Sequence, residues 1–207
     1  MTPSPHGHLT HAFQKSQEVR EDFFKNNLQN LVDTSQLLAE AIGSGNKILI
    51  CGNGGSAADA QHMAAELVGR MLVERKALPA IALTTDSSNL TAIGNDYGYD
   101  FVFSRQVEAL GQQGDILIAI STSGNSKNVL KAIEAANNQG VQVVALTGGS
   151  GGKIAELHRA GQVKVLLNAE KGSCSSEIQE THIFIIHSVV DTMDRYFKHF
   201  WEKESNG

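Results

Sequence analysis

Hydrophobic residues near the start of the chain recur at helical spacing, with acidic and amide residues between them. The positions concerned are Phe13, Val19, Phe23, Leu28, Leu31, Leu38 and Ile42. This pattern predicts one long helix, or two shorter ones, over residues 12–42.

Further along the chain, short apolar runs alternate with helical patterns. The apolar runs occupy residues 47–51, 79–85, 115–121, 141–147 and 163–167, and helical patterns cover residues 56–71, 127–139 and 177–200. Because the apolar runs lack the polar alternation of a half-exposed strand, they favour strands that are buried on both faces of a parallel sheet. We therefore expect an α/β fold, a three-layer sandwich with a parallel sheet of about five strands and helices on both faces.

No linker long enough to divide the chain is visible, so we expect a single domain over residues 1–207. Within it we interpret residues 1–10 as a flexible leader, 11–43 as an N-terminal helical segment, and 47–200 as the α/β core with its C-terminal helix. The histidines at this end, His6, His8 and His11, are interpreted as residues of a fraying terminus rather than as a metal site.

Composition narrows the classes of function. The net charge of −5 argues against a nucleic-acid partner and suits an enzyme that holds an anionic substrate through local donors. Cys51 and Cys174 are the two cysteines of the chain, and we expect both to be reduced rather than part of a disulfide scaffold or zinc finger. Since no run has the length of a signal-peptide core or a membrane span, we expect a cytoplasmic protein without a membrane partner.

Two polar loops follow strands at the carboxyl edge of the predicted sheet, where parallel α/β folds bind ligands. The first is Gly52-Asn53-Gly54-Gly55-Ser56, in which the glycines let the backbone approach a ligand and Ser56 can cap the next helix. The second is Ser121-Thr122-Ser123-Gly124-Asn125-Ser126, which gathers hydroxyls, an amide and backbone donors ahead of a helix. Such residues also simply end strands and cap helices, but two such loops at one edge favour a phosphate site.

These loops do not match the known nucleotide-binding patterns. Neither has the Gly-Lys-Ser/Thr ending of a P-loop, and GNGGSA is not GxGxxG, which disfavours nucleotide binding. A third glycine-rich segment, residues 148–152, is interpreted as a flexible turn.

Two pairs of polar residues on predicted helices are candidates for a metal site. His62 and Glu66 are four residues apart, which places them on one face of their helix. Gln179 and His187 are eight residues apart on the last helix and share a face as well, with Glu180 and His182 nearby. If the two helices meet, the four side chains offer a ligand set suited to zinc; surface hydrogen bonding is the alternative interpretation.

Several segments together resemble the bacterial phosphoheptose isomerases of the sugar-isomerase (SIS) domain superfamily. They are GNGGSAADAQHMAAELVGR, LTAIGNDYGYDFVFSRQVEALG, GDILIAISTSGNSKNVLKAIEAA, VALTGGSGGK and EIQETHIFIIH, and the resemblance runs from about residue 47 to residue 191. It implies a homotetramer with active sites at subunit interfaces, one zinc ion per subunit, and conversion of sedoheptulose 7-phosphate to D-glycero-D-manno-heptose 7-phosphate. That reaction is the first step toward activated heptose, which commonly enters lipopolysaccharide or other surface glycans.

The resemblance also implies roles for individual residues. Glu66 matches the family's catalytic base and His187 its acid, while His62, Glu66, Gln179 and His187 match the zinc ligands. Positions matching substrate contacts are Asn53, Gly54, Gly55, Ser56, Glu66, Arg70, Asn95, Asp96, Ser121, Thr122, Ser123, Ser126 and Gln179. These residue types suit an aldose–ketose isomerisation, which needs a base to move a proton between neighbouring carbons and an acid or metal to stabilise an enediolate oxygen.

One stretch departs from the family pattern. Ser175, Ser176 and Glu177 precede Ile178-Gln179-Glu180, where the family usually has Thr-Ala-Arg. Glu177 reverses a charge, so any contact of that arginine with phosphate or a neighbouring subunit is lost or replaced.

Two alternatives of other kinds stay open. One is a non-catalytic SIS-domain adaptor that binds the replication initiator; the relative of that kind lacks a glutamate at the position of Glu66, which this chain has. The other is a sensor or isomerase for a different sugar phosphate, because the loops encode ligand length only weakly. Zinc could equally be replaced by another divalent ion.

Overall fold

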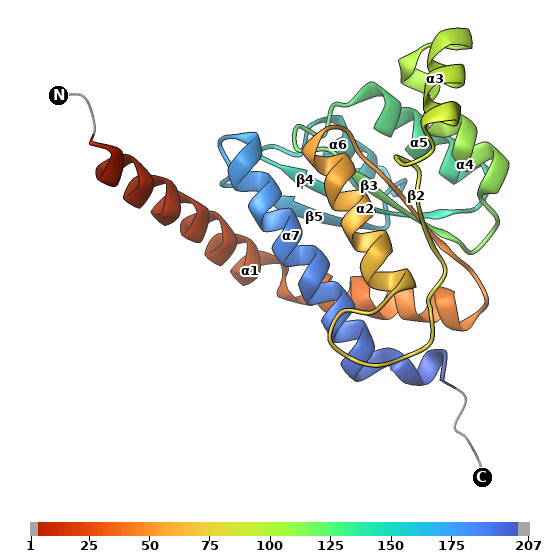
Figure 1. The fold of residues 1–207 in the computed structure, drawn as a ribbon, viewed down its shortest axis with the longest axis horizontal. Coiled ribbons are helices and arrows are strands. Elements are labelled where there is room, and N and C mark those ends of the chain that lie inside the picture. Colours follow the sequence, from red (N-terminus) through yellow and green to blue (C-terminus); the bar gives the residue numbers. More distant parts are fainter. Residues whose placement is uncertain (1–3, 203–207) are drawn as a thin grey trace.

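The computed structural model describes residues 4–202 and confirms the three-layer α/β sandwich (Figure 1). The middle layer is a parallel sheet in the order β2-β1-β3-β4-β5. Its strands are β1 (Ile48–Cys51), β2 (Ala80–Ala82), β3 (Ile116–Ile120), β4 (Gln142–Gly148) and β5 (Val165–Ala169).

Helices cover both faces of the sheet. The long helix α1 (Pro5–Gly43), α2 (Gly55–Val68) and α7 (Ser175–Thr192) pack on one face. The other face carries α4 (Ser104–Leu110), α5 (Lys127–Asn138) and α6 (Gly152–Arg159). Helix α3 (Ser87–Asp96) and the 3₁₀ turn η1 (Tyr99–Phe101) lie at one end of the molecule, in yellow-green in Figure 1.

Neighbouring strand residues enter two separate cores. Ile48 and Ile50 of β1 pack under α1, α2 and α7, whereas Leu49 and Cys51 face α4 and α5. Both faces of the central strands are therefore buried in apolar side chains, which explains why the strands lack polar alternation.

The N-terminal leader predicted for residues 1–10 is wrong for residues 5–10, which are helical; residues 1–3 lie outside the described residues. Ser4 caps the helix by accepting a hydrogen bond from the backbone N–H of Gly7 at 3.1 Å. Pro5 occupies the first helical turn, where its fixed φ fits and no N–H is needed.

Three further stretches differ from the prediction. Residues 87–110 form α3, η1 and α4, and residues 152–159 form α6, for which no elements were predicted. The last helix ends at Thr192 and continues as a π-helical segment, η2 (Met193–Phe197), and a 3₁₀ turn, η3 (Lys198–Phe200). Within residues 4–202, no helix is both long enough and apolar enough to cross a bilayer.

Candidate active site

The two polar loops meet where the strand order of the sheet reverses. Strand β1 pairs with β2 on one side and with β3 on the other, so the chain moves away from β1 in both directions. The loops after β1 and β3 leave the sheet at this switch point. Parallel α/β sheets open a ligand-binding crevice at such a point, outside the carboxyl ends of the strands.

Asn128, a residue that sequence reasoning missed, joins the two loops. Its amide Nδ2 donates to Oδ1 of Asn53 at 2.8 Å, and Nδ2 of Asn53 donates back to Oδ1 of Asn128 at 2.8 Å. Oδ1 of Asn128 also accepts from the backbone N–H of Val129 at 3.0 Å. Since Asn128 is buried in the first turn of α5, it fixes the distance between the loops.

The loop after β3 has a fixed shape. The Oγ atoms of Ser121 and Ser126 lie 2.9 Å apart, and Gly124 takes a φ of +64° and lies against the backbone of Gly151, leaving no space for a side chain. The N–H of Ile154 donates to the carbonyl of Gly124 at 3.1 Å. The glycine-rich segment 148–152 forms the predicted turn, in which the N–H of Gly151 donates to the carbonyl of Gly148 at 3.0 Å. The segment also packs against the loop after β3.

The loop after β1 differs from prediction at Ser56. The N-cap of α2 is Gly54, and Ser56 is a buried residue within the helix whose side chain makes no capping bond. Gly54 takes a φ of +57°, a conformation that a side chain would strain, and the space beside it is open. This bare backbone is accessible to a ligand.

The structure brings three of the four predicted metal ligands together. Nε2 of His62 lies 2.9 Å from Nε2 of His187, although the residues are 125 positions apart, and 3.4 Å from Oε1 of Glu66. One ligand atom from each residue lies within 4.8 Å of the other two. The cluster forms because α2 and α7 pack side by side over the sheet.

This donor set fits a divalent cation of the zinc type. Two imidazoles and a carboxylate are common zinc ligands, and with bonds of about 2.0–2.1 Å a tetrahedral ion separates its ligand atoms by about 3.3 Å. The observed separations of 2.9 and 3.4 Å bracket that value. Without a cation, the facing Nε2 atoms need one proton between them.

Gln179, the fourth predicted ligand, lies elsewhere. Its amide packs against Gly55 at the start of α2, leaving no space for a side chain at that glycine. His62 is seven residues further along α2, and His187 eight residues further along α7. The side chain of Gln179 thus borders the loop after β1, and its role as a metal ligand stays a prediction.

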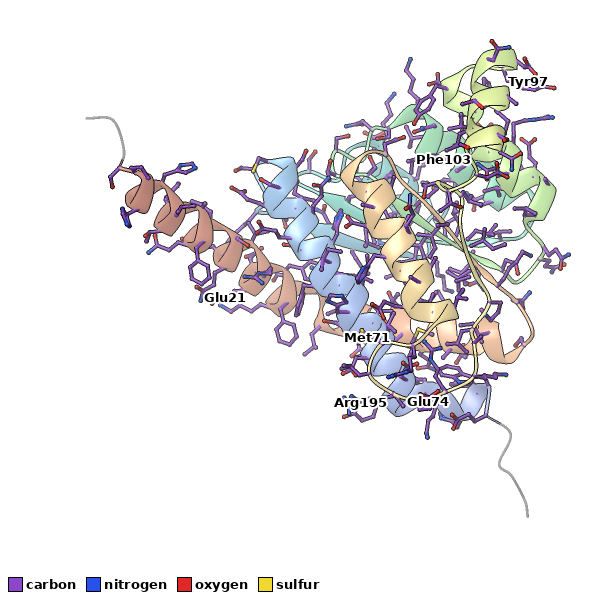
Figure 2. All side chains as sticks on the ribbon, viewed as in Figure 1. Glu21, Met71, Glu74, Tyr97, Phe103 and Arg195 are labelled. Atoms are coloured by element: carbon purple, nitrogen blue, oxygen red, sulfur yellow. The ribbon has the colours of Figure 1, made fainter. Side chains whose placement is uncertain are left out.

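Three predicted substrate contacts face solvent in the single chain. Arg70 is exposed and pairs with Glu74 at 3.2 Å. Asn95 and Asp96 are exposed at the end of α3, where Nδ2 of Asn95 donates to Oδ1 of Asp96 at 2.7 Å. Tyr97, labelled in Figure 2, marks this helix end, far from the labelled Met71 beyond α2.

Glu177 stabilises the start of α7. Its Oε2 accepts from both the backbone N–H and the hydroxyl of Ser173, each at 2.9 Å. These bonds, the backbone bond first, hold the pKa of Glu177 below its usual value. A carboxylate in the first turn also suits the helix dipole, so this residue ties the start of α7 to the turn that precedes it.

A groove of about 740 Å³ runs beside the site between α1 and α7. Gln179, Asp59 and Arg20 are among its lining residues. Burial raises the pKa of Asp59 to about 6, against the opposing effect of His62. Arg20 was not singled out as a site residue, since a charge on a helix gives no sign in the sequence that it faces a groove.

Comparison with known proteins identifies relatives that match most of the chain. Residues 12–148 match the SIS domain family. The phosphoheptose isomerase of Campylobacter concisus is 56% identical over 174 residues, which is 84% of this chain and 88% of that protein. The structure of the phosphoheptose isomerase from Neisseria gonorrhoeae superposes with a TM-score of 0.84 at 46% identity, covering 92% of this chain and 99% of the other.

A second solved structure agrees. The phosphoheptose isomerase from Francisella tularensis gives a TM-score of 0.87 at 35% identity, covering 93% of this chain and 99% of the other. The fold, the paired loops and a similarity that covers most of the chain lead to one assignment: this chain belongs to the phosphoheptose isomerase family of SIS-domain proteins.

Proposed function

We propose that this protein is an isomerase that converts sedoheptulose 7-phosphate to D-glycero-D-manno-heptose 7-phosphate, as the first step toward activated heptose. The observation that carries the proposal is the convergence of Glu66, His62 and His187 beside two phosphate-type loops. The relatives named phosphoheptose isomerase support the same reaction and disfavour an adaptor role.

Proton transfer is assigned to Glu66 and His187. A carboxylate oxygen of Glu66 removes the proton from C1 of the ketose and returns it to C2, so that a C1=C2 enediolate forms and collapses to the aldose. His187 gives a proton to O2 and takes the proton from O1. Atoms and charges balance, because both residues end in their starting states.

His62, Glu66 and His187 are proposed to hold a zinc ion. Gln179 is proposed as a fourth ligand, which requires its side chain to turn away from Gly55. When bound, zinc stabilises negative charge on the substrate oxygens as they lose their carbonyl character. Nε2 of His187 faces His62 at 2.9 Å and would hold the metal, which leaves Nδ1 to carry the exchanged proton. One oxygen of Glu66 faces His62, which leaves the other to act as the base.

The spacing along α2 favours a long sugar phosphate. Gly55 and His62 are seven residues apart, a rise of about 10 Å at 1.5 Å per residue. Eight bonds separate C1 of a heptose from the phosphorus on C7, and at about 1.2 Å per bond of extended chain they span nearly the same length. A triose or tetrose phosphate falls short of reaching both the loops and the cluster.

Substrate contacts are proposed for both loops. Ser121, Thr122, Ser123 and Ser126 supply hydroxyls to the phosphate, together with backbone N–H groups at the start of α5. Backbone N–H groups of Gly54 and Gly55 at the start of α2 also contact the phosphate, while Asn53 and Ser56 line the sugar chain. Because the amide of Asn53 is bonded to Asn128, backbone atoms of this loop are expected to make most of its contacts.

Assembly completes the proposed site. We propose a cytoplasmic homotetramer in which Arg70, Asn95 and Asp96 approach the substrate across subunit interfaces. Their exposure in the single chain is consistent with that arrangement. Apolar side chains are exposed along α1, including Leu9, Phe13 and Leu28, and supply contact area for a partner subunit.

The test is incubation of the purified protein with sedoheptulose 7-phosphate, with and without a chelator and added zinc, while aldose formation is followed by NMR. Pentose and hexose phosphates are run in parallel. Product that forms from the heptose substrate and depends on Glu66 supports the proposal. A folded protein that binds the sugar phosphate without forming product contradicts it and points to a sensor or adaptor.

A further inference from the structure

Arg75 lies in the segment between α2 and β2, yet its side chain is 1% exposed. Its guanidinium donates to four backbone carbonyls: Nη2 to Glu66 at 2.7 Å, and Nη1 to Leu67 at 2.9 Å, Lys76 at 3.1 Å and Gly69 at 3.2 Å. The last carbonyls of a helix have no partner within the helix, and a cation there also suits the helix dipole. Arg75 therefore binds the carbonyls at the C-terminal end of α2. One of them belongs to Glu66, the residue proposed as the base, which follows His62 by one helical turn.

The remaining donor of Arg75 reaches the other helix of the site. Nε donates to Oδ1 of Asp194 at 2.6 Å, and the side chain of Asp194 is also 1% exposed. Asp194 belongs to η2, the π-helical continuation of α7, and follows His187 by seven residues, which is close to two helical turns. Their sequence neighbours Glu74 and Arg195 are labelled at this end of the molecule in Figure 2.

The pair thus bridges the two helices that carry the metal cluster, on the side away from the loops. His62 and Glu66 come from α2, and His187 comes from α7. Apolar packing between helices tolerates small sliding movements, whereas an ion pair with directed hydrogen bonds fixes one relative position. A slide of even about 1 Å would separate atoms that now lie 2.9 Å apart.

Stability alone is a weak explanation for this pair. Removing two charges from water costs several kcal/mol per ion, and buried pairs are often no better than apolar side chains of similar size. Oδ2 of Asp194 has no hydrogen-bond partner among residues 4–202, so part of that cost is not recovered. A role in fixing the register of two helices is the best-supported use of such groups.

We infer that Arg75 and Asp194 are positioning residues that set the register of α2 against α7 and so bring His62, Glu66 and His187 into metal-binding distance. The inference rests on the proposed metal site. Neither residue touches the substrate or the cation. Both act through the backbone of the helices that carry the ligands.

The experiment compares zinc affinity among full-length variants, measured by competition with a chromophoric chelator. Asp194→Asn keeps the shape and removes the charge, and Arg75→Lys keeps the charge but cannot reach four carbonyls. The double variant Arg75→Met/Asp194→Leu replaces the pair by apolar side chains and guards against loss of folding in the single variants. Arg195→Gln is the matched control, because it removes the more exposed pair with Asp191 one position away.

Trp201 is the single tryptophan of the chain and is buried, so its fluorescence reports folding. Zinc affinity is compared only among variants whose Trp201 fluorescence matches that of the parent. We expect zinc to bind about tenfold to hundredfold more weakly in the pair variants and unchanged in Arg195→Gln. Folded pair variants that bind zinc within twofold of the parent overturn the inference and leave the isomerase proposal intact. A parent that isomerises but binds no zinc also overturns it, whereas a parent that does neither contradicts the proposed function itself.

Discussion

Oε1 of Glu66 lies 3.4 Å from Nε2 of His62. This polar contact holds the carboxylate in one position, as a catalytic base requires. Glu66→Gln keeps the shape of the side chain and removes its basicity. We expect kcat to fall by about 10²–10⁴-fold while the affinity for sugar phosphate changes little, because the lost interaction belongs to the transition state. Aldose formation and substrate binding are measured separately, by NMR and calorimetry.

The matched control is Glu134→Gln, which changes an exposed carboxylate paired with Lys131 on α5. It should leave both quantities unchanged. Turnover that survives in Glu66→Gln would remove Glu66 from the role of base.

His182 determines part of the pH dependence of stability. It is fully buried, its Nε2 lies 3.1 Å from the carbonyl of Thr147, and burial lowers its pKa to about 4. In the unfolded chain the pKa returns to about 6.5. Between these values the unfolded state binds a proton that the folded state excludes, so the free energy of unfolding falls as pH falls, by on the order of 3 kcal/mol from pH 6.5 to pH 4.

His182→Gln keeps a hydrogen-bond donor near the carbonyl of Thr147 and cannot titrate. Urea unfolding at intervals between pH 4 and pH 7 should therefore show a flatter stability profile for this variant than for the parent. His11→Gln, an exposed change on α1, serves as the control and should follow the parent. Equal slopes for all three proteins would show that His182 does not contribute.

At the residue scale, the spacing of residues along the chain predicted which side chains share one face of a helix. The four-residue separation of His62 and Glu66 correctly predicted one face, and the strand–loop pattern placed the residues of both loops. Asn128 and Arg75 could not be found in this way, because each acts through a partner that is far away in the sequence. Asn128 bonds to Asn53 and Arg75 to Asp194. The position of Ser56 inside α2 was missed because Gly54, with its positive φ, already starts the helix.

At the scale of elements, the exposed stripe of α1 gives a prediction about assembly. Leu9, Phe13, Phe24 and Leu28 lie within one sector of the helix and are exposed, and the N-terminal half of α1 extends beyond the sheet in Figure 1. Burial of one such side chain contributes about 1.5–3 kcal/mol. Phe13→Glu should therefore raise the dissociation constant of the proposed tetramer by at least tenfold, as measured by analytical ultracentrifugation.

Gln14→Glu is the control, since it adds the same charge at the neighbouring exposed position, outside this sector. It should leave the sedimentation profile unchanged. If Phe13→Glu sediments like the parent at all concentrations, the stripe does not form the subunit interface.

Strands were easier to predict than the shorter helices. Each strand of the sheet lies within, or overlaps, an apolar run of the sequence. In β1, β3 and β4 the run follows from burial on both faces, whereas the edge strands β2 and β5 are partly exposed. Helix α3 has no fully buried residue, so its sequence carries little hydrophobic periodicity, and it escaped prediction together with η1, α4 and α6. The helical start of α1 escaped for a different reason, because Pro5 is compatible with a first turn as well as with a flexible leader.

At the scale of the whole molecule, the proposed metal ion couples folding to the site. The ligands come from α2 and α7, which are separated by four strands of the chain but share one core. A cation that binds only where these helices are packed must stabilise the folded state by mass action. The net charge of −5 does not oppose the binding of a cation, and the ligands themselves are local to the cluster.

Zinc at a hundredfold excess over its dissociation constant contributes about 2.7 kcal/mol to the folded state, which corresponds to a Tm increase of roughly 5–10 °C for a chain of this size. We expect the chelator-treated protein to melt lower and to recover when zinc is added. His187→Ala should lose most of this response along with its bound metal and its activity, whereas His11→Ala should keep all three. An unchanged zinc stoichiometry in His187→Ala would exclude His187 as a ligand. If zinc does not change the Tm of the parent, the packing of α2 against α7 does not depend on a metal.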